Sequence, residues 1–414
     1  MPNVLPTPAY IADKMLEFLF EGSDVTNNVN RQYESQFAMT KESIGKTLQI
    51  KNPPRYRSQA GPVISTVQST NFGLTPFTID RWSTIPIKIT GEEKTFNNAK
   101  ELDLWADENI KPITAPLISD VETAIFDLYY KAGNHVGTPG TGITTNDPLL
   151  AAREVLSLYE TPKQDRVCYI DPSAARKYGN GMVAVFNPAN TLSDQYKTGN
   201  IAPVAGFDVR EANYVTSHTT GSRTSTGSNI LTDNPVPQVG SIIHLDTWTT
   251  GTTLLRGDTF NVAGVYGVNP VTGRSTGQLR KFTVQDTATA SSNEGDVTIY
   301  PPVIPSGAFK NITGATADLT GIPDDAIVTV TTGTASTAYA QNLAWWKNSI
   351  GLVTVPIAPL EGVTKSITRS YKGISLTFST GGDIMNYETI KRVDMAFGVN
   401  IFDPYRDCVA RITG

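Results

Sequence analysis

Residues 112–132 constrain the fold most, because they carry the longest amphipathic helix pattern in a chain that otherwise shows strand and turn patterns. Their apolar residues recur at spacings of three and four, which makes one helical face apolar. The residues on this face are Ile113, Leu117, Val121, Ala124, Ile125, Leu128 and Ala132. Pro112 suits the first turn of a helix, whereas Pro116 requires a later start or a bend, and Gly133 favours an end there. One long helix among many strands predicts an α+β fold in which sheets pack against this helix.

The composition narrows the class of protein. Of the 414 residues 18% are charged, which is below the roughly 25% of an average globular domain. The net charge of −5 gives no electrostatic reason to bind nucleic acid or an anionic membrane. The two cysteines, Cys168 and Cys408, predict a reduced compartment rather than a disulfide framework. No apolar run is long enough to cross a bilayer and no secretion signal is recognisable, so we expect a soluble protein made in the cytosol.

A second, shorter helix is predicted for residues 7–20. Pro8 fits its first turn, and Ile11, Met15 and Leu19 fall on one face. This apolar face could pack on the chain's own domain or on a neighbouring subunit. The three residues are therefore candidates for a subunit interface.

A strand pattern begins in residues 46–95. Apolar residues alternate at 47–50 and again at 77–90, where Pro86 cannot donate to a central ladder and so predicts an edge strand. Two edge-like strands joined by a long polar connection predict a projecting two-stranded arm, which needs another surface to cover it. Trp82 on the second strand is a candidate for that contact.

The connection in this arm carries the basic cluster of Lys51, Arg55 and Arg57, which surrounds Tyr56. Basic residues around an aromatic side chain could contact nucleic acid, although few charges are involved. Salt bridges to another protein surface are the more natural use of this cluster. We therefore treat the three cations as candidates for subunit contacts.

The middle of the chain mixes helix and strand patterns. Residues 147–160 predict a helix with Asp147 as its cap and Pro148 in its first turn. An apolar strand pattern at 166–171 and a short helical turn at 172–180 follow. Together they predict the body of an α+β domain.

Helical periodicity disappears between about residues 220 and 339. Alternating runs such as TFNVAGVYGV, QLRKFTV and AIVTVTT recur there, separated by Gly, Asn, Pro and Asp turns. The flanks are rich in Thr, Ser and Gly and are typical of flexible linkers around an inserted domain. We predict one α+β host that is interrupted by an all-β barrel or sandwich at 222–338.

No motif in the sequence predicts catalysis. Gly273, Ser275 and Gly277 match the nucleophile pattern G-x-S-x-G, but they lie between two strand patterns and indicate a hairpin tip. The glycine-rich loop at 137–142 lacks the Lys-Ser/Thr of a phosphate-binding loop. The three histidines stand far apart in sequence and show no zinc-ligand spacing. We expect no catalytic, cofactor or metal site.

Three stretches resemble a known family: VAGFDV at 204–209, LRGDTFNVAGVYGVNPVTG at 255–273 with LRKFTV at 279–284, and MAFGVNIFDP at 395–404. With the order of parts along the chain, they resemble the major capsid (coat) proteins of tailed bacteriophages, which have the Hong Kong ninety-seven fold. The likeness is greatest to the short-tailed-phage coat proteins that carry an inserted β-barrel, the I domain.

The resemblance assigns a role to each part of the chain. It implies an N-terminal arm at 1–45, an E-loop at 46–95, a P domain with the spine helix at 96–140, the A domain and P-domain body at 141–221 and 339–414, and the I domain at 222–338. In this family the insertion has a loop that reaches a neighbouring capsomer. Residues 231–240 correspond to it, and Asp233 is their single charged residue and a further interface candidate.

The resemblance also implies a function. Subunits of this family assemble around a scaffolding protein into hexamers and pentamers of an icosahedral procapsid with a portal protein. The shell expands as double-stranded DNA is packaged, and the family has no catalytic site. We therefore expect a virion protein that is assembled in the bacterial cytoplasm and makes no membrane contact. The alternatives are another phage structural protein, such as a tail or decoration component, and then a hydrolase with a β accessory domain.

Overall fold

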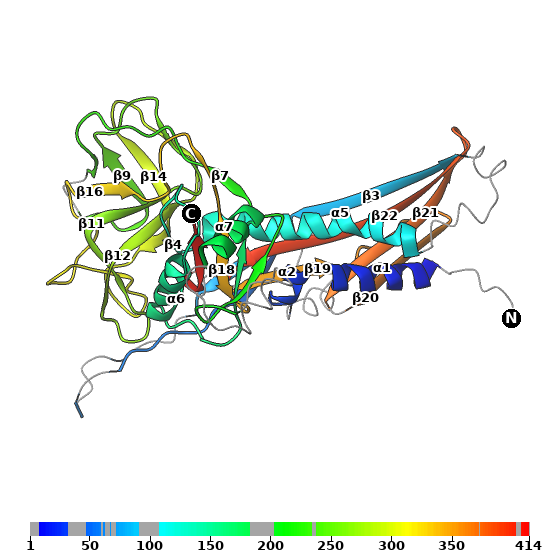
Figure 1. The fold of residues 1–414 in the computed structure, drawn as a ribbon, viewed down its shortest axis with the longest axis horizontal. Helices are drawn as coiled ribbons and strands as arrows, with labels where there is room; N and C mark the ends of the chain where they lie inside the picture. The colour runs from blue at the N-terminus through cyan, green and yellow to red at the C-terminus, as the bar shows by residue number, and fades with distance from the viewer. Residues whose placement is uncertain are drawn as a thin grey trace. The chain divides into compact units, whose positions relative to one another are not determined.

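The computed structural model describes residues 8–31, 47–58, 61–62, 67, 72–90, 107–182, 203–233, 237–371, 373–402 and 407–413. The chain divides into two compact units, each assembled from segments that are far apart in sequence (Figure 1). Unit 1 comprises Met1–Ile50, Thr75–Ile125 and Ile350–Asn400, and unit 2 comprises Lys51–Leu74, Phe126–Ser349 and Ile401–Gly414. The fold is α+β, as predicted, with few helices and many strands.

The predicted long helix exists, but its bounds differ from those expected. Helix α5 spans Asp107–Phe126, and a 3-10 helix, η1, continues at Asp127–Lys131. Both prolines lie inside α5. The prediction that Pro112 lies in the first turn is therefore wrong, and so is the later helix start that Pro116 suggested. An interior proline costs about 3 kcal/mol, whereas each fully buried large apolar side chain contributes about 1.5–3 kcal/mol. Ile110 and Leu117 are fully buried, and such burial offsets the prolines.

The sheet of unit 1 has the order β19-β22-β21-β20, and β3 also pairs with β22. Its strands are β3 (Arg81–Thr90), β19 (Ile350–Val355), β20 (Lys365–Tyr371), β21 (Ile374–Asp383) and β22 (Glu388–Ile401). Pro86 lies opposite Arg392 of β22, and in the described part of the chain β3 has no second neighbour. The edge position predicted from Pro86 is confirmed. Ser83 of β3 donates to Asp120 of α5, so the helix lies along this sheet as expected (Figure 1).

The predicted two-stranded arm is arranged differently. The alternating pattern at 77–90 divides into β2 (Leu74–Thr78) and β3, and β1 (Thr47–Lys51) pairs with β2 instead of β3. The alternating pattern does not show that one strand ends at Thr78 and the next begins at Arg81. That division depends on the pairing of β3 with β22, which is distant in sequence.

Two N-terminal helices complete unit 1: α1 (Pro8–Gly22), as predicted, and α2 (Asp24–Asn27). Ser23 caps α2, and its Oγ accepts a hydrogen bond from the Thr26 N–H at 3.3 Å. The same hydroxyl donates to Glu122 Oε1 of α5 at 2.8 Å. The cap therefore connects the N-terminal segment to the long helix.

Unit 2 contains a five-stranded host sheet with the order β4-β23-β18-β5-β6. Its strands are β4 (Asn134–Val136), β5 (Arg166–Ile170), β6 (Asp208–Glu211), β18 (Asn342–Trp346) and β23 (Val409–Ile412). Helices α6 (Asp147–Leu158) and α7 (Pro172–Met182) accompany it, so the predicted helix, strand and helical turn are confirmed. The cap of α6 is Asn146, one residue earlier than predicted. Trp345 stacks on Tyr169, with 5.0 Å between ring centroids, in the core of this sheet.

A closed barrel of six strands fills the predicted insertion. The ring runs β12-β14-β9-β8-β16-β11 and closes because β11 also pairs with β12. Its strands are β8 (Ile230–Thr232), β9 (Gly240–Asp246), β11 (Thr259–Val268), β12 (Ser275–Val284), β14 (Gly295–Val303) and β16 (Ile327–Val330), with β15 (Ile312–Thr313) added to β11. Closure removes exposed sheet edges. Phe260, Phe282 and Trp248 lie fully buried in its separate apolar core.

Two short strands lie at the flanks of the barrel, whereas residues 220–229 lie outside the named strands. Strand β7 (Ser217–Thr219) enters the barrel region and pairs antiparallel with β17 (Ala338–Ala340), which leaves it. A further small pair joins β10 (Thr253–Leu254) to β13 (Ala288–Thr289). The chain therefore enters and leaves the barrel through adjacent strands. Among the described helices, none is long and apolar enough to cross a membrane.

Candidate assembly surfaces

The three apolar candidates on α1 are buried within their own unit. Ile11, Met15 and Leu19 are each at most 2% exposed, and α1 packs against β20 and β21. Of the two alternatives left open by the sequence, the structure shows packing on the chain's own domain. These side chains are core residues and offer no contact surface on the single chain.

The basic cluster of the arm contacts its own unit as well. The Arg57 Nη2 donates to the Lys310 carbonyl at 3.4 Å, and the Arg55 guanidinium lies 5.7 Å from the centroid of the Phe309 ring. Lys51 is exposed at the end of β1. Arg55 and Arg57 therefore contact residues of their own unit, whereas Lys51 is open to solvent.

Trp82 presents an exposed aromatic ring on the edge strand β3. Its side chain is 58% exposed, and its indole Nε1 donates to Thr84 Oγ1 at 2.9 Å and to Asp394 Oδ1 at 3.2 Å. These bonds fix the ring in position. An oriented aromatic side chain on an edge strand is suited to contact another protein.

The turn between β21 and β22 is an apolar feature that the sequence reasoning missed. Ile384, Met385 and Tyr387 are 95%, 92% and 76% exposed. The motif GGDIMNY signals a turn, and only its three large apolar residues could have drawn attention to it. We call residues 384–387 the hairpin tip.

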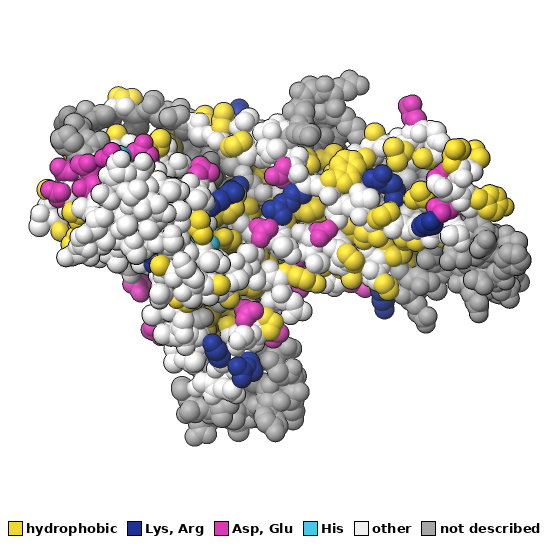
Figure 2. All heavy atoms as spheres, turned by 90° about the horizontal axis from the view of Figure 1, so that it is seen from above, with side chains coloured by type: hydrophobic (Ala, Val, Ile, Leu, Met, Phe, Trp, Pro, Cys, Tyr) yellow, Lys and Arg dark blue, Asp and Glu magenta, His cyan; other side chains and the backbone are white. Residues whose placement is uncertain are grey.

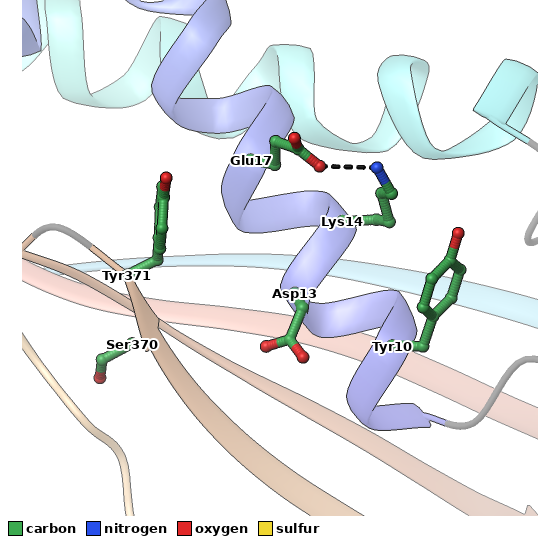
Figure 3. Close-up of a pocket in the computed structure, with 6 residues that line it drawn as sticks. All are labelled: Tyr10, Asp13, Lys14, Glu17, Ser370 and Tyr371. Atoms are coloured by element: carbon green, nitrogen blue, oxygen red, sulfur yellow. Dashed lines mark hydrogen bonds and ion pairs between the residues drawn. The ribbon is translucent and has the colours of Figure 1, made fainter.

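A groove lies on unit 1 between α1 and the end of β20 (Figure 3). Its volume is about 300 Å³. The residues that line it are Tyr10, Asp13, Lys14, Glu17, Ser370 and Tyr371. Lys14 and Glu17 form an ion pair at 2.7 Å on the helix side, and the tyrosine rings supply the apolar walls.

Asp233 belongs to an acidic cluster on the barrel, where Figure 2 shows carboxylates gathered with a histidine. Ligand-type atoms of Asp233, His244 and Glu294 lie within 4.8 Å of one another. His244 Nδ1 is 2.7 Å from Asp296 Oδ1, and this hydrogen bond raises the pKa of the histidine. Burial, and then the nearby carboxylates, raise the pKa of Asp246. Exposed carboxylates often gather without a metal, so the cluster by itself defines no metal centre.

Buried polar contacts join the barrel to the host sheet inside unit 2. Arg280 of β12 is 1% exposed in its side chain, and its Nη2 lies 2.7 Å from Asp407 Oδ1. Lys281 donates to the His135 carbonyl, and Thr283 Oγ1 donates to the Ala132 carbonyl at 3.2 Å. Burial lowers the pKa of Lys281 to about 8. This seam therefore contains two cationic side chains, of which Arg280 is fully buried.

The motifs that could have indicated catalysis have structural roles. Ser275 begins β12 after a tight turn, as predicted, and its Oγ accepts from the Gly277 N–H at 3.2 Å. Cys168 and Cys408 are buried, and burial raises their thiol pKa values to about 12 and about 11. Such thiols are poor nucleophiles at neutral pH.

The exposed apolar side chains of Trp82 and of the hairpin tip are suited to contacts with other proteins. The family model described as "P22 coat protein - gene protein 5" matches residues 90–409. The chain therefore belongs to the P22 coat protein family. It is a self-assembling capsid protein of the virion and not an enzyme.

Solved phage structures are also similar to this chain. A structure from Mycobacterium phage Che8 matches 94% of this chain and 90% of its own, with 11% identity and a TM-score of 0.47. The capsid of Cyanophage P-SCSP1u matches 90% and 84%, with 12% identity and a TM-score of 0.41. The mature capsid of bacteriophage PhiM1 matches 89% and 82%, with 9% identity and a TM-score of 0.41. A search of curated proteins by sequence finds no match.

Proposed function

We propose that this chain is the major capsid subunit of a phage head, forming hexamers and pentamers of an icosahedral shell around double-stranded DNA. The observation that carries this proposal is the coat-protein family match over residues 90–409. In the proposed pathway, a scaffolding protein directs assembly of a procapsid in the bacterial cytoplasm, a portal protein occupies one vertex, and the shell then expands.

The parts of the fold suit such a subunit. We assign α5 to the spine helix of a P domain, residues 46–95 to the E-loop, and residues 1–45 to the N-terminal arm. The barrel within 222–338 corresponds to an I domain, and the segments 141–221 and 339–414 to the A domain and the remaining P-domain body. The paired strands β7 and β17 support the insertion, because they bring its entry and exit together.

The charge of the chain supports the enclosure of DNA without adhesion. A net charge of −5 over 414 residues gives the chain no overall electrostatic attraction to a polyanion. Weak contacts between subunits, repeated by symmetry, can sum to a stable shell and still rearrange during expansion.

Expression with and without the scaffolding protein of the same phage tests this proposal. Sedimentation of the purified material should show closed particles when the scaffold is present, and particles, sheets or tubes when it is absent. A uniform monomer in both preparations would contradict the proposal. The coat family match leaves no observation in favour of a tail or decoration component.

A further inference from the structure

The turn that carries the hairpin tip is ordered by hydrogen bonds to the Asp383 carboxylate. Asp383 Oδ1 accepts a hydrogen bond from the Met385 N–H at 2.9 Å, and Asp383 Oδ2 accepts one from Asn386 Nδ2 at 2.8 Å. Ile384 and Met385 are nevertheless almost fully exposed. A turn that is already ordered loses little conformational entropy on binding, so it is a favourable contact element.

The groove beside α1 offers the complementary surface. Tyr10 and Tyr371 are 51% and 43% exposed, and their rings stand on opposite sides of the groove with Asp13 between them (Figure 3). A volume of about 300 Å³ is at the lower end of the range for ligand pockets. Methionine is well suited to such a site, because its flexible thioether makes favourable contacts with aromatic rings.

The tip cannot occupy the groove of its own chain. Tyr371 pairs with Ile374 at the first residue of β21, whereas the tip follows Asp383, the last residue of that strand. Ten residues of strand separate them, or about 30 Å at roughly 3.3 Å per residue. An occupant with the chemistry of the tip must therefore come from a second copy.

We propose that the hairpin tip of one subunit inserts Met385 between Tyr10 and Tyr371 of a second copy, with Ile384 and Tyr387 packed at the rim of the groove. This inference rests on the proposed assembly of the chain into a shell. Tip and groove are different surfaces, so the contact is heterologous and closes into a ring where the symmetry allows.

The size of the contact fits a shell rather than a stable dimer. Three side chains on a turn cover much less than the roughly 800 Å² per partner of a standard stable interface. One such contact is weak, and many of them in a closed assembly act together. Isolated chains would therefore not be held together by the tip alone.

Disulfide cross-linking in assembled particles tests the pairing. A disulfide requires the two Cα atoms to approach within about 7 Å. The native Cys168 and Cys408 are buried and should therefore form no cross-links between chains. The double variant Met385→Cys with Tyr371→Cys, oxidised mildly, should give a ladder of covalent multimers on a non-reducing gel. Each single variant should remain monomeric on the same gel.

The matched control combines Met385→Cys with Ile242→Cys, an exposed barrel position that is 55% exposed. This control should give no ladder. Particles of the double variant without a ladder would overturn the proposal, and so would cross-linking by Met385→Cys alone, which would mean that tips meet tips.

Failure of the pairing between tip and groove can be distinguished from failure of the proposed assembly. If wild-type chains form no particles, the assembly itself fails, whatever the cysteine variants do. If only the double variant fails to assemble, the two single variants are co-assembled in equal amounts, so that tip and groove cysteines are often on neighbouring subunits. Tip and groove cysteines should then give covalent dimers in the particles, and their absence would overturn the proposal.

Discussion

Asp407→Asn tests the buried seam between the barrel and the host sheet. Arg280 is buried and contacts Asp407 at 2.7 Å, and its guanidinium lies 4.8 Å from the centroid of the Tyr159 ring. Burial alone would lower the pKa of Arg280, but the Asp407 charge raises it above its ordinary value. Replacing this carboxylate with an amide of similar shape leaves a buried cation without its counter-charge.

The expected magnitude follows from the exposure of the two partners. Removing one partner of a fully buried ion pair costs about 3–5 kcal/mol. Asp407 is 22% exposed in its side chain, so we reduce the expected loss to about 2–3 kcal/mol because solvent screens this pair in part. For a unit of this size, such a loss lowers the melting temperature by about 5–10 °C.

Urea unfolding of the purified chain, followed by circular dichroism, measures this loss. Asp208→Asn is the matched control, because Asp208 and its ion-pair partner Arg210 are 45% and 39% exposed; it should leave stability nearly unchanged. The double variant Arg280→Met with Asp407→Asn should be less destabilised than Asp407→Asn alone. A loss below about 0.5 kcal/mol for Asp407→Asn would refute the reasoning.

Two further predictions concern unit 1 and the arm. Burial raises the pKa of Glu122 above its usual 4.5, so the folded chain binds this proton more tightly than the unfolded chain. The stability of the wild type relative to Glu122→Gln should therefore rise as the pH falls from 7 towards 4.5. Urea titrations that give the same difference in unfolding free energy between the two proteins at both pH values would contradict this. Changing Lys51, Arg55 and Arg57 together to Ala should reduce particle yield more than chain stability, because we propose that these cations contact a neighbouring subunit. An equal loss in both assays would mean that these residues serve only the subunit's own fold.

Local patterns predicted much of the fold. The run TFNVAGVYGV became β11 without a shift, and the helix at 147–160 was recognisable from its Asp-Pro start. Strand alternation and helix-start signals each involve residues that are close together in the chain, so they can be recognised in a single sequence. The recurrence of such strands at short intervals predicted an all-β barrel or sandwich, and the pairing of β11 with β12 shows that it is a closed barrel.

Features that depend on contacts distant in sequence could not be predicted from the sequence. The burial of Ile110 and Leu117 determined where α5 begins, against the rule for interior prolines. His244 and Asp296 are neighbours because β9 pairs with β14 in a particular register, which the sequence of neither strand reveals. The hairpin tip was predictable as a turn, but its exposure became visible only with the sheet around it.

Cryo-electron microscopy of particles purified after expression with the scaffold shows whether this chain forms a closed shell. We expect closed icosahedral shells, in whose reconstruction each subunit shows the long helix α5 and a separate six-stranded barrel. Isolated chains, or helical tubes of tail type without closed shells, would contradict it.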